Sequence, residues 1–441
     1  MKKKYSAAKR TVKFGKMLLL LHAFLLVLAA CSSGGGAQST NNEQKGASAG
    51  NNEAVETIKV WLPPFSTGDV SDETFWRKQL DKFEKTHHAK VELEIIPWSN
   101  YEERYLTAIS SENGPDVGYM YMEMLSDYIK LGTLEPLDDY FTQEEKDNYI
   151  YWDKGTVAGK QYTVPIIVGN VSVLYANMDI LRKSGFTEPP KTWDDLVAYA
   201  KKIQQDSPEV YAFVQEWGEP SITGLNHSFY PYLWQAGGEL FNKEGTELTL
   251  DSPEALKAIK FLNDLKHTYK IIPDAATSLT TQDLKSLLPE GKAAMAIMGT
   301  SLSADLDKAG LNWDYTTSLT QKQGGTFAAA DSLVMLRTAK NKELAAELIK
   351  FLTSPEVMEA YHQVIYSAPP ISKNEKYYDN AKFEKLYTKD SQLFHTLTPI
   401  DGSSKIYDAL YKNLQLMILG QLTPEEVQKD TAQYAKSIYN R

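Results

Sequence analysis

Two short apolar runs separated by a single break lie in the stretch QYTVPIIVGNVSVLYANMDILRKSG, residues 161–185. β-branched residues dominate both runs, 164–168 and 171–175, so both are predicted to be strands. Gly169 and Asn170 occupy the break, and these residue types tolerate unusual backbone angles at the least cost. Such residues can form a hinge where a chain leaves one lobe and enters another. The same local pattern is typical of a β-hairpin or a bulge in one sheet, and the surrounding sequence has to decide.

Strand and helix patterns alternate before this stretch. Strands are predicted at residues 58–62, 91–96 and 116–120, and amphipathic helices at 72–85 and 101–111. Strands joined by helices at this spacing indicate right-handed βαβ units and a parallel sheet.

Helix start signals follow the break. Thr192 and Asp195 form a predicted capping box, and Ser-Pro or Thr-Pro pairs precede helices near residues 253, 355 and 424. Two more stretches, 327–332 and 367–371, are predicted to cross between lobes. The sequence therefore predicts two lobes joined by three crossings.

Several phrases carry a resemblance to a known family. They are Gly114–Val117, residues 132–138, Tyr162 with Pro165, Tyr175 with Asn177, Asp179–Leu181, Pro190–Asp195 and Gly291–Met295. Through them the chain resembles the extracellular solute-binding proteins of ABC importers, in the maltose-binding-protein class, over roughly residues 57–440.

The resemblance implies an α/β fold of the two-lobe, type II periplasmic-binding-protein kind. Each lobe is expected to hold a mostly parallel sheet flanked by helices, with three hinge crossings between the lobes. The first lobe is predicted at residues 57–167 and 332–368, and the second at 170–328 and 372–441.

The first residues are predicted to be a targeting signal. Residues 1–30 combine a basic leader with an apolar run too short to span a membrane, which is typical of a signal peptide. The run ends in Leu28-Ala29-Ala30-Cys31, which resembles a lipobox and predicts lipidation of Cys31. A lone Cys is more often a buried small residue, but its position after the apolar run favours lipidation. Residues 31–56 are rich in Ser, Gly, Asn and Gln and are predicted to be a flexible tether.

The charge balance limits the kinds of partner that the chain can bind. Without the predicted leader the chain keeps 40 basic against 57 acidic side chains, because the leader holds seven basic residues and no acid. This balance argues against nucleic acid and against an anionic membrane surface as partners. The expected location is the outer face of the cell membrane of a Gram-positive bacterium, reached through the lipid anchor.

Candidate ligand-binding residues come from one geometric filter. Ligands of open α/β sheets bind beyond the carboxyl ends of strands. Residues that follow predicted strands, or the helix-like stretch after them, are Phe65, Ser66, Tyr121, Glu123, Asn170, Glu216, Trp217, Tyr230, Trp234 and Asp331. Aromatic faces with carboxylates and amides suit a sugar. Each aromatic could equally be core, and Glu123 and Asp331 could be solvated loop acids.

The resemblance adds detail to this site. It implies that Glu123 stands at a carboxylate position of the first-lobe ligand loop and that Tyr407 stands where the family has an aromatic on a late helix. Gly169 and Ser301 stand where maltose binders carry a carboxylate and a Trp, which speaks against maltodextrin itself.

Enzyme signatures are weak. Asp194-Asp195 could suggest paired glycosidase carboxylates, but they more simply stabilise a helix N-terminus. No P-loop, nucleophile elbow or zinc-protease motif is present. The sequence therefore predicts a monomeric lipoprotein, without cofactor or metal, that captures an oligosaccharide for an ABC permease with a separate ATPase. The alternatives are a cell-surface lipoprotein without a transport role and a carbohydrate-active enzyme on the same fold.

Overall fold

The computed structural model describes residues 55–66, 68–242, 247–366, 368–376, 381–397, 400 and 402–439. The predicted signal peptide, Cys31 and nearly all of the predicted tether lie outside these residues, as does Ser367 of the predicted third crossing. Among the described helices, none is long and apolar enough to cross a bilayer.

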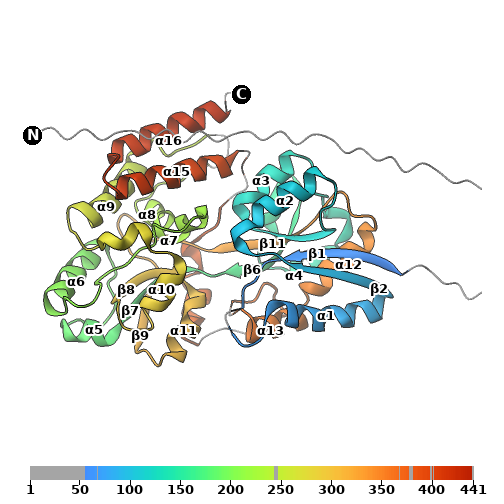
Figure 1. The fold of residues 1–441 in the computed structure, drawn as a ribbon, viewed down its shortest axis with the longest axis horizontal. Helices are drawn as coiled ribbons and strands as arrows, with labels where there is room; N and C mark the ends of the chain where they lie inside the picture. Colours follow the sequence, from blue (N-terminus) through green and yellow to red (C-terminus); the bar gives the residue numbers. More distant parts are fainter. Residues whose placement is uncertain are drawn as a thin grey trace, which may run out of the picture. The chain divides into compact units, whose positions relative to one another are not determined.

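The first sheet has five strands in the order β2-β1-β3-β11-β6 (Figure 1). Their bounds are Ala89–Ile95, Glu56–Leu62, Val117–Met120, Ala329–Met335 and Thr163–Gly169. β1 runs parallel to β2 and β3, whereas β11 is antiparallel to both β3 and β6. The helices α1 (Asp72–His87) and α2 (Tyr101–Ser110) connect the parallel strands, so the predicted βαβ units are confirmed.

The second sheet has three strands in the order β8-β7-β9, with bounds Met295–Gly299, Ser172–Asn177 and Trp313–Thr316. β7 is antiparallel to both neighbours, and isolated parallel bridges join Tyr211 to Ala293 and Val214 to Ala296. Both sheets are therefore mixed, where mostly parallel sheets were expected. In the first sheet the reason is topological: β6 leaves at the carboxyl edge of the parallel strands, so β11, which returns at that edge, must run the opposite way.

The break at Gly169-Asn170 is a passage between the two sheets. β6 pairs with β11 in the first sheet and β7 pairs with β8 and β9 in the second, so the hairpin alternative is wrong. Gly169 has φ +102° and Asn170 has φ +41°, which fits the residue types that sequence analysis singled out. Gly169 pairs with Ala329 of the second crossing, and a Cβ on Gly169 would lie 2.5 Å from Pro369 Cγ. Gly169 therefore lies beside the start of the second crossing and beside Pro369 of the predicted third crossing.

The predicted third crossing, 367–371, is followed by residues that are still bonded to the first lobe. Ile371 accepts a hydrogen bond from the Ile150 backbone (2.9 Å), and Lys373 donates one to Asn148 (2.9 Å). Glu375 bonds the buried His362 side chain and accepts from the Ile371 backbone. These contacts hold residues 371–376 to the first lobe, while the helical segment from 381 onward packs against the second sheet. The remaining lobe boundaries stay a prediction.

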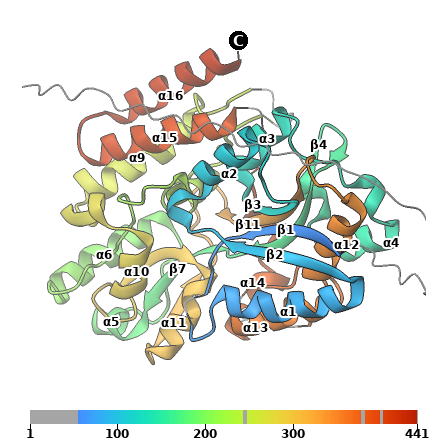
Figure 2. The same ribbon diagram turned by 45° about the vertical axis from the view of Figure 1, so that its right-hand side comes forward.

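Helices cover both sheets and complete the second lobe. In Figure 1, α1 and α13 lie on one side of the first sheet and α2 and α3 on the other, and in Figures 1 and 2 α15 and α16 lie beside α9. The capping box predicted at Thr192 and Asp195 opens α6 as expected. The other helices are α3 Met122–Lys130, α4 Gln143–Asn148, α5 Met178–Lys183, α6 Trp193–Asp206, α7 Leu225–Ser228, α8 Tyr230–Gln235, α9 Pro253–His267, α10 Thr281–Leu287, α11 Ser303–Lys308, α12 Lys342–Leu352, α13 Pro355–Val364, α14 Glu384–Thr388, α15 Ser403–Ile418 and α16 Pro424–Tyr439. The short strands are β4 Thr156–Val157, β5 Lys160–Gln161, β10 Thr326–Phe327 and β12 Phe394–His395.

Candidate functional site

Two carboxylic acids of the first lobe, one on a helix and one on a strand, lie near enough for the charge of one to act on the other. Glu123 is in the first turn of α3 and is 3% exposed, and Asp331 is on β11 and partly exposed. Burial raises the pKa of Glu123 to about 8, with the charge of Asp331 adding to the rise. Burial raises the pKa of Asp331 to about 7, opposed by the Tyr119 hydroxyl, which donates to Asp331 Oδ2 at 2.7 Å. At neutral pH such a pair can both donate and accept hydrogen bonds.

Residues of the second lobe face this acid pair. The Asn226 side chain of α7 forms a hydrogen bond that opposes the rise in the pKa of Glu123. Tyr230 of α8 is fully buried, and the nearby charge of Glu123 is one cause of its raised pKa. The ring of Tyr407, from α15, crosses that of Tyr230 edge to face at 6.1 Å. The structure thus brings four of the predicted residues together: Glu123, Asp331, Tyr230 and Tyr407.

Three buried polar atoms at this place lack a hydrogen-bond partner among the described residues. They are Glu123 Oε1, Asn226 Oδ1 and the Tyr230 hydroxyl. Buried polar groups are nearly always hydrogen-bonded in folded proteins, so unpaired groups gathered at one place need an explanation. A ligand with several hydroxyl groups would satisfy them, because it can both donate and accept.

The predicted residues Asn170 and Ser301 sit beside one another at the first crossing. Ser301 donates its backbone N–H to Asn170 Oδ1 at 3.3 Å. Ser172, two residues later, donates to the Asn226 carbonyl at 2.8 Å and its hydroxyl lies 2.7 Å from His227 Nδ1. Burial lowers the pKa of His227 to about 4, so this side chain is neutral at pH 7. Hydrogen bonds from Ser172 therefore connect the segment after the first crossing to Asn226 and His227 of α7.

Aromatic side chains line the first-lobe side. Phe65 lies 5.5 Å from the ring of Tyr119, which holds Asp331, and 5.3 Å from Trp98. The backbone N–H groups of Phe65 and Ser66 both donate to Asp72 Oδ2, so Ser66 helps to fold this loop. Tyr121 donates its hydroxyl to Glu102.

Two predicted site residues, Glu216 and Trp217, are placed elsewhere, whereas the ring of Trp234 lies 5.7 Å from that of Tyr230. Trp217 is 1% exposed, packs against Tyr411 at 6.3 Å and walls a separate cavity of about 480 Å³ with Gln415. Glu216, beside it, accepts from Thr281 Oγ1 at 2.7 Å. Trp234 stacks on His395 at 4.6 Å and donates its indole N–H to Glu239. Both tryptophans are buried, as core packing, the alternative left open for each aromatic, requires.

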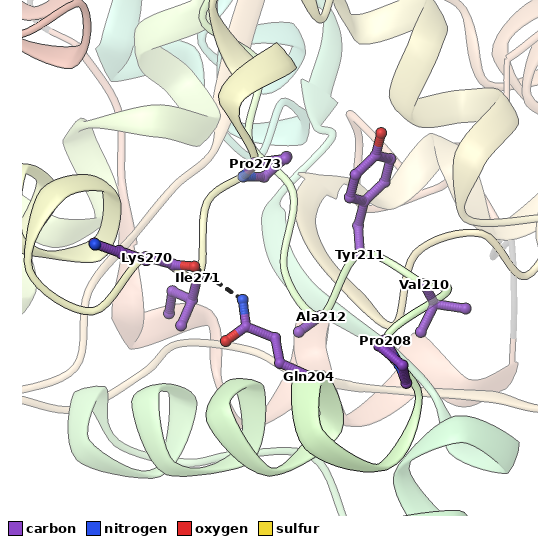
Figure 3. A pocket seen from close by; sticks show the side chains of 8 residues that line it. All are labelled: Gln204, Pro208, Val210, Tyr211, Ala212, Lys270, Ile271 and Pro273. Atoms are coloured by element: carbon purple, nitrogen blue, oxygen red, sulfur yellow. Dashed lines mark hydrogen bonds between the residues drawn. The ribbon is translucent and has the colours of Figure 1, made fainter.

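A second cavity, of about 310 Å³, opens on the second lobe and is lined by residues that include Gln204, Tyr211 and Lys270 (Figure 3). Its lining shares no residue with the site above, and the Gln204 side chain closes one side by donating to the Lys270 carbonyl at 2.9 Å. This cavity therefore has no part in the interlobe site.

Sequence reasoning missed Trp98, Tyr119 and Asn226. Trp98 follows the end of β2 after Pro97, so the filter of strand ends could have found it. Tyr119 is within β3 and Asn226 lies beside the aromatic stretch, and neither position carries a local signal.

Comparison with known proteins defines the class. Residues 67–359 match the sequence pattern of the bacterial extracellular solute-binding proteins, and the chain belongs to that family.

Several relatives and solved structures are similar to this chain. A Brucella abortus protein described only as a binding protein is 29% identical over 366 residues, covering 80% of this chain and 86% of that one. The diacetylchitobiose binding protein DasA of Streptomyces coelicolor is 27% identical over 335 residues, covering 70% and 72%. A Thermotoga lettingae solute-binding protein solved with α-D-tagatose superposes with a TM-score of 0.73 at 24% identity, covering 87% of this chain and 100% of that one. The last likeness shows the fold, which is that of the type II binding proteins.

Proposed function

We propose that this protein captures a carbohydrate between its lobes and delivers it to the permease of an ABC transporter. The observation that carries the proposal is the acid pair Glu123–Asp331, faced by Asn226 and Tyr230 with unpaired polar atoms and bordered by aromatic rings. Carboxylates, amides and phenols hold sugar hydroxyls, and aromatic faces cover the apolar face of a pyranose. The sugar named for the Streptomyces relative supports this class of ligand.

The proposed hinge for capture comprises the crossing at Gly169-Asn170 and the second crossing, whose Ala329 pairs with Gly169. Because α3 belongs to the first lobe while α7 and α8 belong to the second, a ligand between them would hold the lobes together. Opening at residues that absorb changes of φ and ψ would expose the acid pair and release the ligand. The permease and its ATPase are separate chains in this proposal.

The protein would act outside the cell as a monomer. The predicted lipobox at Cys31 supports a lipid anchor, and the predicted tether would keep the folded body near the outer face of the membrane of a Gram-positive cell. Departures at Gly169 and Ser301 support an oligosaccharide other than maltodextrin.

Binding without turnover separates this proposal from the enzyme alternative. The purified protein is screened against linear oligosaccharides by thermal shift, the binders are titrated calorimetrically, and each sugar is recovered and analysed after overnight incubation. The expected result is saturable binding and unchanged sugar. A shortened or transferred sugar would support the enzyme, and no binding across the set would support a surface protein without a transport role.

A further inference from the structure

An exposed tryptophan lies at the carboxyl edge of the first sheet. All eight tryptophans are described, and Trp98 alone is exposed, at 43% of its surface. Single exposed apolar residues are common and need no explanation by themselves. The position and the fixed orientation of Trp98 are what distinguish it.

Trp98 stands at the edge of the sheet where ligands bind. β2, β1 and β3 are neighbouring parallel strands, and Leu62 pairs with Ile95, so the strands end at one edge. An aromatic residue follows each of them: Trp98, Phe65 and Tyr121. Phe65 is partly buried and Tyr121 is 6% exposed, so Trp98 presents the largest free face of the three.

The orientation of Trp98 is held from two sides. Its indole N–H donates to the Pro64 carbonyl at 2.9 Å, so the polar edge is satisfied by the protein. Its ring meets Phe65 edge-on at 5.3 Å and Tyr101 at 5.3 Å. A side chain that is fixed and still exposed offers a stacking surface without the entropy cost of ordering it on binding.

The link from Trp98 to the acid pair is short. The ring of Tyr119 lies 5.8 Å from Trp98, and the Tyr119 hydroxyl holds Asp331 at 2.7 Å. One tyrosine side chain thus separates the exposed indole from the carboxylates that face the second lobe.

We propose that Trp98 is the stacking platform for a second sugar unit, beyond the unit held at Glu123 and Asp331, so that the ligand is an oligosaccharide that extends toward the β2 edge. This inference rests on the proposed function and names the residue that selects chain length. Trp98 would contribute through its apolar face, because its one polar atom is already bonded to Pro64.

Calorimetric titration of matched sugars tests the inference. The probes are cellotriose and diacetylchitobiose, each beside its monosaccharide, with the parent, Trp98→Ala, Trp98→Phe and the control Tyr434→Ala, an aromatic on α16 that is 42% exposed. Trp98→Ala is expected to weaken oligosaccharide binding about tenfold. The same change should leave the monosaccharide unaffected, while Trp98→Phe recovers most of the loss and Tyr434→Ala changes nothing.

Two kinds of failure are distinguishable. If the parent binds an oligosaccharide and Trp98→Ala binds it equally well, or weakens both sugar lengths by the same factor, the inference is overturned and the proposed function stands. If the parent binds neither oligosaccharide, the inference fails together with carbohydrate capture of these sugars. The phenylalanine variant keeps the test valid if the alanine variant folds poorly.

Discussion

The buried carboxyl of Glu123 should make the empty protein less stable as pH rises through neutrality. Its folded-state pKa of about 8 lies above its ordinary value of 4.5, so the folded protein holds this proton more tightly than the unfolded chain does. Its contribution to the free energy of unfolding is therefore complete below pH 4.5 and is lost as pH rises through 8. His227 works in the opposite direction, since its depressed pKa of about 4 makes stability rise between pH 4 and 6.5.

The magnitude is clearest above pH 6.5, where His227 no longer contributes. One pKa unit corresponds to about 1.4 kcal/mol, so Glu123 alone should cost about 1.5 kcal/mol between pH 6.5 and 8. Glu123→Gln removes this ionisation and should flatten the pH dependence by that amount. Glu216→Gln, at a separate acid whose pKa burial raises to about 8, should flatten it independently.

The assay is urea unfolding at pH 6.5, 7, 7.5 and 8, followed by tryptophan fluorescence. The midpoint of the parent should fall with pH, and the midpoint of Glu123→Gln should fall less. If parent and Glu123→Gln show the same dependence, Glu123 is ionised and solvated in the empty protein, and the buried state of its carboxyl is refuted.

Three further predictions concern the hinge at Gly169, the buried Trp217 and the lipid anchor. Gly169→Ala should destabilise the protein by at least about 2 kcal/mol in chemical unfolding, because Gly169 combines positive φ with a close contact. The control Gly185→Ala, at φ +85° with open space around it, should cost less. Equal losses of stability would contradict close packing at the Gly169 crossing. Trp217→Ala should lower the melting temperature, with a cost of about 3–5 kcal/mol, and leave sugar affinity unchanged, while Tyr230→Phe should keep the melting temperature and reduce the shift that sugar produces. If Trp217→Ala instead weakened sugar binding and kept the melting temperature, Trp217 would be a ligand-binding residue. Cys31→Ala should abolish labelling of cells with a fatty-acid probe, and persistent labelling would refute the anchor.

Local signals predicted the elements that depend on local chemistry. The break at Gly169-Asn170 was visible because few other residue types accept positive φ, but the surrounding sequence was needed to favour a crossing over a hairpin. The Thr192 capping box was predictable because its two partners are three residues apart. The strand-end filter named Glu123 because it follows β3 closely in the sequence, whereas Asp331 lies within β11 and not at a strand end.

Features that depend on distant residues were not predictable in the same way. Residues 371–376 stay with the first lobe because Glu375 meets His362, a contact that no local pattern encodes. Trp217 and Trp234 follow strand and helix signals like true site residues, but their burial depends on Tyr411 and His395, far along the chain. An aromatic composition suitable for sugar binding is equally suitable for a core, and only packing separates the two.

Hydrogen–deuterium exchange with and without a bound oligosaccharide tests the central claim most directly. Ligand held between the lobes should slow exchange at the same time in α3, Met122–Lys130, and in the segment from Leu225 to Gln235 that contains α7 and α8. Backbone amides around the cavity lined by Gln204 and Lys270 should exchange at the same rate with and without the sugar. Protection confined to one lobe, or centred on that cavity, would contradict capture at Glu123 and Asp331.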